Sequence, residues 1–509
     1  MAETLVRGRL ADGDGTRRQE TAKERATRCA GGETLARAFG LASGGDGLRA
    51  TGHAPPQGAA TTASNRSESM TARRSAFHGH MMTCLAALGA AGLLACAAGS
   101  AVAEETFEAS FGLGGEYNDN VTERRNGPDD FVSHVKPELR YKYDAERVAA
   151  SIRYKGDYAF YMQGESPDDY SHTLEAKALL ELAEERFFLD ISENLRPVYR
   201  QASRGDLIEG DTRRDQTDQN TFAVSPYLVF GSGERVSLKT GYRFTDIRYA
   251  DETEPGSGSR TFLPGWSSGE TSLNRNVKQQ HDIFADGEYE MTERVALLTG
   301  YQISRQESEE QQDFTRHRPY VGFRYEYMQD STLKLRCGPM LTETDDGESS
   351  TRFYYSADVA HALGRHKLTF RSERDYTEDP QSGRSILRQM NTAGILFDFD
   401  RSRLTTSMGY SEYDSTLEGG GNKFWRPGVN YSYDLTERLK ASAGATAELD
   451  AGSDSATTSD RVYLNTGLNY ELSESSWLAL TYRYKAVDSS DSASSFNVNR
   501  VMLEWGMTF

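Results

Sequence analysis

Cysteine is scarce in this sequence. The residues are Cys29, Cys84, Cys96 and Cys337, so the chain after position 103 holds a single thiol. One thiol can form neither an internal disulfide nor a thiolate metal cluster. Stability after position 103 must therefore come from backbone hydrogen bonding and burial.

Long hydrophobic runs are missing as well. Mean hydropathy is −0.66 and the formal net charge is −18, and the one conspicuous apolar run lies within residues 84–95. These values are typical of a soluble acidic protein. They also fit a membrane β-barrel, because only every second residue of a spanning strand has to face lipid.

The apolar run has the layout of a secretory signal peptide. A short basic stretch precedes it, and Ala101 and Ala103 follow it as an A-x-A cleavage site. We therefore predict a cleaved signal over residues 70–103. Residues 1–69 are predicted to be a mis-called start or a disordered extension. The alternative is a lipoprotein box that ends at Cys96.

Sequence motifs of catalysis and cofactor binding are missing too. The chain has no H-E-x-x-H, no P-loop and no G-x-G-x-x-G that opens a helix. His361 and His366 are five residues apart, which on a strand places them on opposite faces. We expect no enzyme activity, no metal, no cofactor and, since the chain is acidic, no nucleic acid. A catalytic cluster at a barrel rim would be spatial, and it stays an alternative.

The end of the chain shows what the sequence does contain. In Val501–Phe509 the odd positions carry Val, Leu, Trp, Met and Phe, and the even positions carry Met, Glu, Gly and Thr. A period of two predicts a β-strand with one apolar face. Such a strand at the end of a soluble protein is an aggregation hazard. A closed barrel removes the hazard by pairing the last strand with the first.

The same alternation recurs between regularly spaced breaks. Nine short polar turns, such as 143–147 and 291–294, alternate with ten longer segments rich in Asp, Glu, Gly and Ser. The longer segments lie near 120–130, 161–169, 203–218, 250–275, 308–312, 344–350, 378–384, 416–422, 451–459 and 488–495. Nine turns and ten loops predict twenty strands. A β-solenoid or propeller would instead need a motif at a fixed period, and none is found.

We therefore predict an all-β fold, a transmembrane antiparallel β-barrel of the bacterial outer membrane. It should have about twenty strands (18–22), occupy residues 104–509 and contain no plug domain. Short turns should face the periplasm and long loops the cell exterior. In each strand the apolar set should face lipid and the alternate set the lumen; Leu238 and Lys239 are one such pair.

Both ends of the predicted barrel resemble known outer-membrane proteins. Phe509, with Trp505 before it, resembles the insertion signal of bacterial outer-membrane barrels, which makes the barrel assembly machinery an expected partner. The opening Phe107–Val121 is Gly-rich and ends in Tyr-x-Asp-Asn-Val, which resembles the start of the outer-membrane β-barrel porin 2 family. That resemblance implies no catalytic residues. It also implies a link to exopolysaccharide loci, which members of the family often accompany, and some members resemble polysaccharide export conduits.

A barrel of this size encloses a wide lumen that something has to narrow. The longest loop, near 250–275, carries Phe262, Leu263 and Trp266, which an exposed loop would not favour. We predict that this loop folds inward as a constriction. An equally open alternative packs it on the rim or against lipopolysaccharide.

Basic residues concentrate at predicted lumen positions, and acidic residues concentrate in the loops. The predicted pore-lining residues are Arg140, Arg153, Lys155, Lys239, Arg243, Arg324, Arg336, Arg426, Arg483 and Arg500. Further bases at such positions are Lys136, Lys142, Lys334 and Lys485, and inward acids include Glu138, Glu326, Glu448, Glu471 and Glu504. A ring of basic side chains favours anions. The alternative is that pairs of Arg and acid only solvate and brace a wide lumen.

The sequence thus favours a passive, monomeric channel for polar solutes, with anions and saccharides as candidates and exopolysaccharide export as the setting that the resemblance implies. The alternative is a non-conducting barrel that anchors surface polysaccharide or proteins. The expected surroundings are outer-membrane lipid and lipopolysaccharide.

Overall fold

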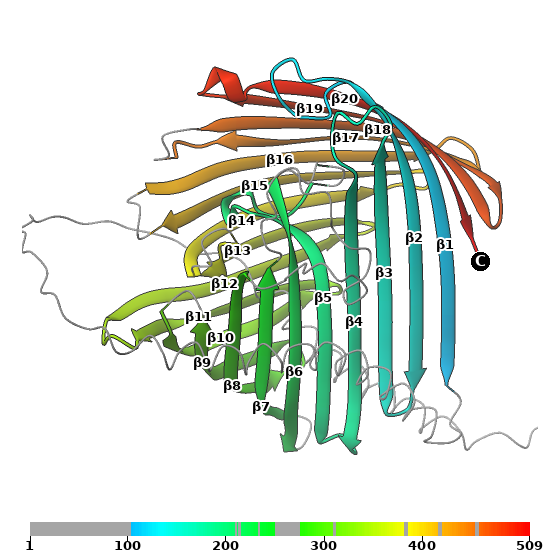
Figure 1. Ribbon diagram of the computed structural model, residues 1–509. Helices are drawn as coiled ribbons and strands as arrows, with labels where there is room; N and C mark the ends of the chain where they lie inside the picture. Colours follow the sequence, from blue (N-terminus) through cyan, green and yellow to red (C-terminus); the bar gives the residue numbers. More distant parts are fainter. Residues whose placement is uncertain are drawn as a thin grey trace, which may run out of the picture.

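The computed structural model describes residues 103–509 apart from 209–210, 212–214, 233–234, 250–274, 309–311, 381–384, 416–419 and 454–457. Twenty described strands form one antiparallel sheet in which each strand pairs with its neighbours in sequence. β1 also pairs with β20, from Ser110 opposite Thr508 to Asn118 opposite Arg500. The sheet is therefore a closed barrel, and Figure 1 shows blue β1 beside the red C-terminal strand. The sequence-based prediction of about twenty strands is confirmed.

The first ten strands are β1 (Glu104–Asn118), β2 (Asp130–Ala145), β3 (Val148–Tyr161), β4 (Asp169–Ala183), β5 (Phe187–Tyr199), β6 (Gln216–Ser232), β7 (Val236–Tyr249), β8 (Arg275–Thr292), β9 (Val295–Ser308) and β10 (Phe314–Met328). The second ten are β11 (Ser331–Thr344), β12 (Ser349–Leu363), β13 (His366–Glu378), β14 (Ser385–Asp398), β15 (Ser402–Ser415), β16 (Gly420–Asp434), β17 (Leu439–Asp450), β18 (Ser459–Ser473), β19 (Ser476–Ser489) and β20 (Phe496–Thr508). Two short 3-10 helices are η1 (Ala202–Arg204) and η3 (Ser492–Ser494).

The strands form because their side chains alternate between apolar and polar. On β19, Leu480 is 45% exposed, and it lies between Leu468 of β18 and Leu503 of β20. Large exposed apolar side chains of this kind define the outer face of the barrel. The alternate residues define the inner face. An isolated protein with so much exposed apolar surface would aggregate, whereas lipid covers the same surface in a membrane barrel.

The two ends of the barrel differ as the sequence predicts. Nine short turns join the strands at one end, where β1 also begins and β20 ends. Ten longer connections join the strands at the other end. Tight turns demand left-handed backbone, which Asp330 (φ 54°) and Gly364 (φ 64°) supply. We name the two rims the short-turn end and the long-loop end.

The last residue closes the short-turn end. The Phe509 N–H donates to the Ala109 carbonyl at 2.7 Å, and the Phe509 side chain is 71% exposed. Trp505 lies on the outer face opposite Leu113 of β1. Their role as an insertion signal stays a prediction.

Several sequence-based predictions fall outside the described residues. The signal peptide predicted over residues 70–103 is one, since all of it but Ala103 lies outside. The loop that carries Phe262, Leu263 and Trp266 is another. Ala103 is described and directly precedes β1. In the described part of the chain, no helix is long and apolar enough to cross a membrane.

Candidate functional site in the barrel lumen

All ten predicted pore-lining residues have inner-face positions in the strand register. Arg140 lies opposite Arg153, and their neighbours Leu139 and Ile152 are exposed on the outer face. The same parity holds for Lys155, Lys239, Arg243, Arg324, Arg336, Arg426, Arg483 and Arg500. That these residues line a conducting path stays a prediction.

Many of the inner bases are paired with carboxylates. Glu138 accepts from Arg140 at 2.8 Å and from Arg153 at 3.1 Å, and its second oxygen lies 3.8 Å from Lys155 Nζ. Lys136 contacts Glu504 at 2.5 Å. This wall is therefore a braced network of both signs rather than a bare basic surface.

Similar ion pairs join inner-face residues of β8, β10, β12 and β13. Arg324 of β10 contacts Glu288 of β8 at 2.7 Å, and Arg371 of β13 contacts Asp358 of β12 at 2.6 Å. Neither Glu288 nor Asp358 was among the predicted inward acids. The signal for both was present in the sequence, because each follows the polar parity of its strand.

Apolar side chains fill part of the lumen near the short-turn end. Phe188, Tyr227 and Phe284 form a buried cluster on the inner faces of β5, β6 and β8. Lys239 is only 5% exposed, with its Nζ 4.1 Å from the centre of the Tyr227 ring. Lys239 thus makes a cation–π contact, and it is covered rather than open to the lumen.

The β5–β6 loop, residues 200–208 with Asp211, crosses the lumen near the long-loop end. Arg426 of β16, ten strands round the barrel from β6, donates from Nη2 to the Ser203 carbonyl at 2.5 Å. Arg204 donates to the Tyr463 hydroxyl of β18 at 3.2 Å. Figure 1 shows the upper part of β5 bending away from β4 toward the far wall. The loop therefore obstructs the lumen at the long-loop end.

Buried ionic contacts hold this loop in place. The Arg204 guanidinium lies 3.7 Å from the centre of the Tyr199 ring and contacts Asp211 at 3.1 Å. Asp211 also contacts Lys485 of β19 at 2.6 Å. Burial alone would raise the pKa of the Asp211 carboxyl. The nearby charges of Lys485 and Arg204 outweigh burial and lower that pKa to about 2. Asp211 is therefore an anion at neutral pH, and its loss would leave buried cations unpaired.

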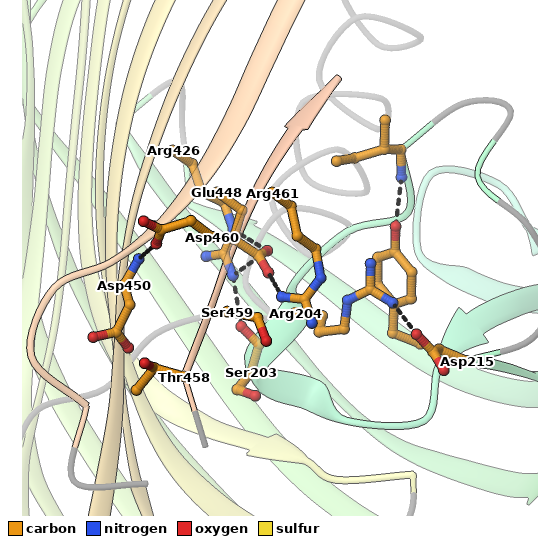
Figure 2. Close-up of polar contacts among 12 residues, drawn as sticks. Ser203, Arg204, Asp215, Arg426, Glu448, Asp450, Thr458, Ser459, Asp460 and Arg461 are labelled. Carbon is orange, nitrogen blue, oxygen red and sulfur yellow. Dashed lines mark hydrogen bonds and ion pairs between the residues drawn. The ribbon is translucent and has the colours of Figure 1, made fainter. Parts of the chain in front are cut away.

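A second ionic group lies on the wall that the loop contacts, on β16, β17 and β18. Glu448 of β17 accepts from Arg426 at 3.1 Å and from Arg461 of β18 at 2.7 Å. Figure 2 shows these side chains converging from the wall, with Arg426 turned toward Ser203 of the loop. Glu448 is 3% exposed, so its charge is shielded from water and is balanced by the two arginines.

The long-loop end of β13 and the residue that follows it also make contacts across the lumen. Asp375 contacts Arg318 of β10 at 2.6 Å, and Glu378 contacts Lys278 of β8 at 3.4 Å. Asp379 then accepts from the Ala202 N–H of the β5–β6 loop at 3.1 Å. Two insertions from opposite walls therefore meet across the mouth.

Below these insertions part of the lumen is open. Uncharged polar side chains on the inner face of four adjacent strands are exposed there, namely Thr405, Ser407, Asn430, Ser442, Asn465 and Asn469. Toward the short-turn end the same face carries the ion pairs Lys440–Asp434 and Arg403–Asp398. Small residues such as Gly428 and Gly444 lie among the uncharged polar side chains. This patch of the inner face therefore presents uncharged hydrogen-bonding groups to the lumen.

Sequence reasoning did not identify the constriction that the structure describes. It placed a loop near 203–218 but singled out 250–275, where length and apolar residues drew attention. The usable signal was a loop rich in paired charge, since Arg204 and Asp211 sit in a segment bounded by Tyr199. The absence of a plug domain is not confirmed, because residues 1–102 lie outside the described part and a loop occupies the lumen.

Comparison with solved structures finds outer-membrane porins and receptors among the similar chains. OccK1 from Pseudomonas aeruginosa is 13% identical, with a TM-score of 0.37, and the match covers 79% of this chain and 99% of that chain. A mutant of the ferric enterobactin receptor PfeA from the same organism is 10% identical (TM-score 0.44, 79% and 80% covered). The FrpB iron transporter from Neisseria meningitidis is 10% identical (TM-score 0.42, 80% and 83% covered). At these values, what those proteins carry says nothing about this chain.

Comparison with curated proteins gives no match. A family model does match, over the strands that form the far wall of the constriction and the closing strand. A resemblance to a family was drawn from the opening residues of the sequence, and the family model matches the C-terminal strands instead. Residues 426–509 match the family described as "Putative beta-barrel porin 2".

Proposed function

We propose that this protein is a constricted outer-membrane channel for small polar solutes. The observation that carries the proposal is the β5–β6 loop, which obstructs the long-loop end while the inner face below it keeps exposed polar side chains. A purely structural barrel has no need of an open polar half below a separate obstruction. A free pore would need no obstruction. Together the two features fit a channel whose mouth selects by size and charge.

The position of the loop bears on the class of solute. With Arg204, Asp211 and Lys485 in contact, the mouth is suited to small solutes rather than to a polymer chain. Polysaccharide export would require the loop to leave the lumen. We therefore propose that the transported solutes are small polar molecules, with anions and saccharide-sized solutes as the first candidates. Exopolysaccharide export is the alternative.

The proposed location is the outer membrane of a Gram-negative bacterium, with the short-turn end toward the periplasm. The exposed apolar outer face supports contact with lipid, and the acidic loop residues support bridging to lipopolysaccharide through divalent cations. Asp345 and Asp346 are examples at the long-loop end. The barrel assembly machinery would recognise Phe509 as the insertion signal.

The decisive experiment is conductance of the chain from Glu104 onward, reconstituted in planar bilayers. We expect a small, steady conductance from the parent and a several-fold larger one from Arg204→Ala, because that variant removes the contacts to Asp211 and Tyr463. Arg365→Ala is the matched control, since Arg365 lies in a short turn and pairs only with Asp400 among the described residues.

A second candidate is the non-conducting structural barrel, which the buried inner clusters favour. Phe188, Tyr227 and Phe284 close part of the short-turn end, and Met340, Tyr354 and Leu387 lie near the long-loop end. If a correctly folded, heat-modifiable barrel conducts in neither the parent nor Arg204→Ala, the channel is wrong and the structural barrel stands.

A further inference from the structure

Three cationic side chains converge on the inner face of the last two strands. Arg483 of β19 lies directly opposite Arg500 of β20. Lys485 is two residues along β19, so it shares the same face. Directly opposite side chains have Cβ atoms about 5 Å apart, and like charges at that separation destabilise the sheet. The arrangement therefore carries a cost that nearby carboxylates only partly remove.

The nearby carboxylates are committed to other bases. Glu123 of the β1–β2 loop contacts Lys485 at 2.8 Å and Arg500 at 3.2 Å. Asp211 contacts Lys485 and Arg204. Arg483 makes no hydrogen bond or ion pair with any residue that the structure describes, although it is only half-exposed. Arg483 is thus the cation of the group whose charge no described carboxylate balances.

Other charged groups around the cluster do not supply the missing anion. Glu116 of β1 lies on the inner face near Arg500, but its nearest basic contact is His134, at 4.0 Å. Asp119 accepts from the backbone and side-chain amides of Asn499. Around the hollow, Arg204, Arg483, Lys485 and Arg500 therefore face two buried carboxylates, those of Glu123 and Asp211.

The cluster borders a hollow below the β5–β6 loop. Its lining includes Ile208, Asp211, Asn465, Arg483, Lys485 and Arg500. Asn465 lies opposite Arg483 on β18 and brings an amide donor to the same place. An unpaired guanidinium beside an amide, under a lid of ion pairs, is the arrangement that holds a planar or tetrahedral oxyanion.

We propose that Arg483, with Asn465 and the edge of Lys485, forms an oxyanion-binding subsite at the constriction. The ligand class is a small carboxylate or phosphate, held bidentately by the Arg483 guanidinium. The inference rests on the proposed channel only for its role in selecting solutes. As a binding site it stands without conduction.

Binding is tested first, and apart from conductance. Inorganic phosphate and acetate are titrated separately by calorimetry into the full barrel in detergent, for the parent and for Arg483→Gln. We expect binding by the parent and a loss of about tenfold or more in Arg483→Gln, because a hydrogen bond between charged groups is worth ~1.5–3 kcal/mol. Arg483→Lys should recover only part, since it keeps the charge and loses the fork. Preference between the two titrants decides between phosphate and carboxylate.

The matched control is Arg140→Gln. Arg140 also faces an arginine across a strand pair, but Glu138 already occupies it. Arg140→Gln should leave oxyanion affinity unchanged. Equal loss in both variants, or no binding by the parent, would overturn the subsite.

Conductance separates this proposal from the channel itself. In a salt gradient, Arg483→Gln should shift the reversal potential toward cations and weaken block of chloride current by phosphate, while Arg365→Gln, in a short turn, should do neither. Oxyanion binding without any conductance would keep the subsite and sink the channel. Conductance with no change of selectivity or block in Arg483→Gln would keep the channel and sink the subsite.

Thermal stability gives a reading that a merely structural arginine would not. Because Arg483 faces Arg500 without a described partner, Arg483→Gln should leave the ligand-free barrel as stable as the parent or more so. A clear destabilisation would mean that Arg483 braces the wall, and would count against the subsite.

Discussion

The Tyr320 ring occupies the space beside Gly300, its direct partner across the β9–β10 pair. A Cβ at position 300 would come 2.4 Å from Tyr320 Cε1. From there the Tyr320 hydroxyl donates to Asp286 of β8 at 2.7 Å. One glycine thus allows an aromatic ring to span three strands on the inner face.

Gly300→Ala should destabilise the barrel by about 1–3 kcal/mol, because the added methyl has to displace the Tyr320 ring. The measurement is the free energy of unfolding in urea of the barrel in lipid vesicles. Gly115→Ala is the control, since a Cβ there meets nothing within 4 Å. Equal effects of the two substitutions would contradict the packing of Tyr320.

A charged side chain should destabilise the barrel on the outer face of β17 but hardly at all on the inner face. Ala443 and Ser442 are neighbours and both are exposed, Ala443 on the outer face and Ser442 on the inner face. Ala443→Arg should cost ~2–4 kcal/mol of unfolding free energy near the membrane midplane, because lipid cannot solvate the guanidinium. Ser442→Arg should cost little. A similar loss in both would mean that the faces are wrongly assigned.

Cys337 offers a chemical test of the same assignment. It is exposed on the outer face of β11, between Val321 and Tyr355. In vesicles a lipid-soluble pyrene maleimide should label it, and a charged methanethiosulfonate should not. Ser442→Cys in a Cys337→Ser background should show the reverse preference. Rapid labelling of Cys337 by the charged reagent would place that thiol in water.

The contacts of the β5–β6 loop should persist over most of the pH range. The folded pKa of Asp211, about 2, lies below its ordinary value of 3.8. Stability from this group is therefore present above pH ~4 and is lost as the pH falls through ~2. We expect conductance to be constant from pH 7 to pH ~4 and to rise below that. In Asp211→Asn the conductance should already be raised at pH 7, and a step near pH 6 in the parent would exclude Asp211 as its cause.

Phe509 should matter for assembly more than for the finished barrel. Phe509→Ala should lower the amount of heat-modifiable barrel in the outer membrane of expressing cells, because the exposed terminal aromatic is the predicted insertion signal. Refolding of the same variant in detergent should be nearly unchanged. Phe399→Ala, another exposed aromatic at the short-turn end, is the control.

The barrel wall could be predicted from the sequence because its determinants are local. Alternation such as Val462, Leu464, Thr466 and Leu468 identifies a strand within a few residues. The polar breaks count the strands. The register then follows from parity, which explains why the predicted basic residues share the inner face.

The contents of the lumen could not be predicted in the same way. Arg204 and Tyr463 are 259 residues apart, and Lys485 and Asp211 are 274 apart. No periodic pattern encodes such a pair. Whether an inward arginine is braced, covered or open depends on partners from distant strands, as the different surroundings of Arg140, Lys239 and Arg483 show.

The β5–β6 loop also fixes an order of events during assembly. Its wall partners Arg426, Tyr463 and Lys485 belong to β16, β18 and β19, which follow the loop by more than two hundred residues in the sequence. The loop can dock only once those strands have joined the sheet. A sheet that lacks these strands cannot hold the loop across the lumen, so the obstruction is complete only when the barrel is.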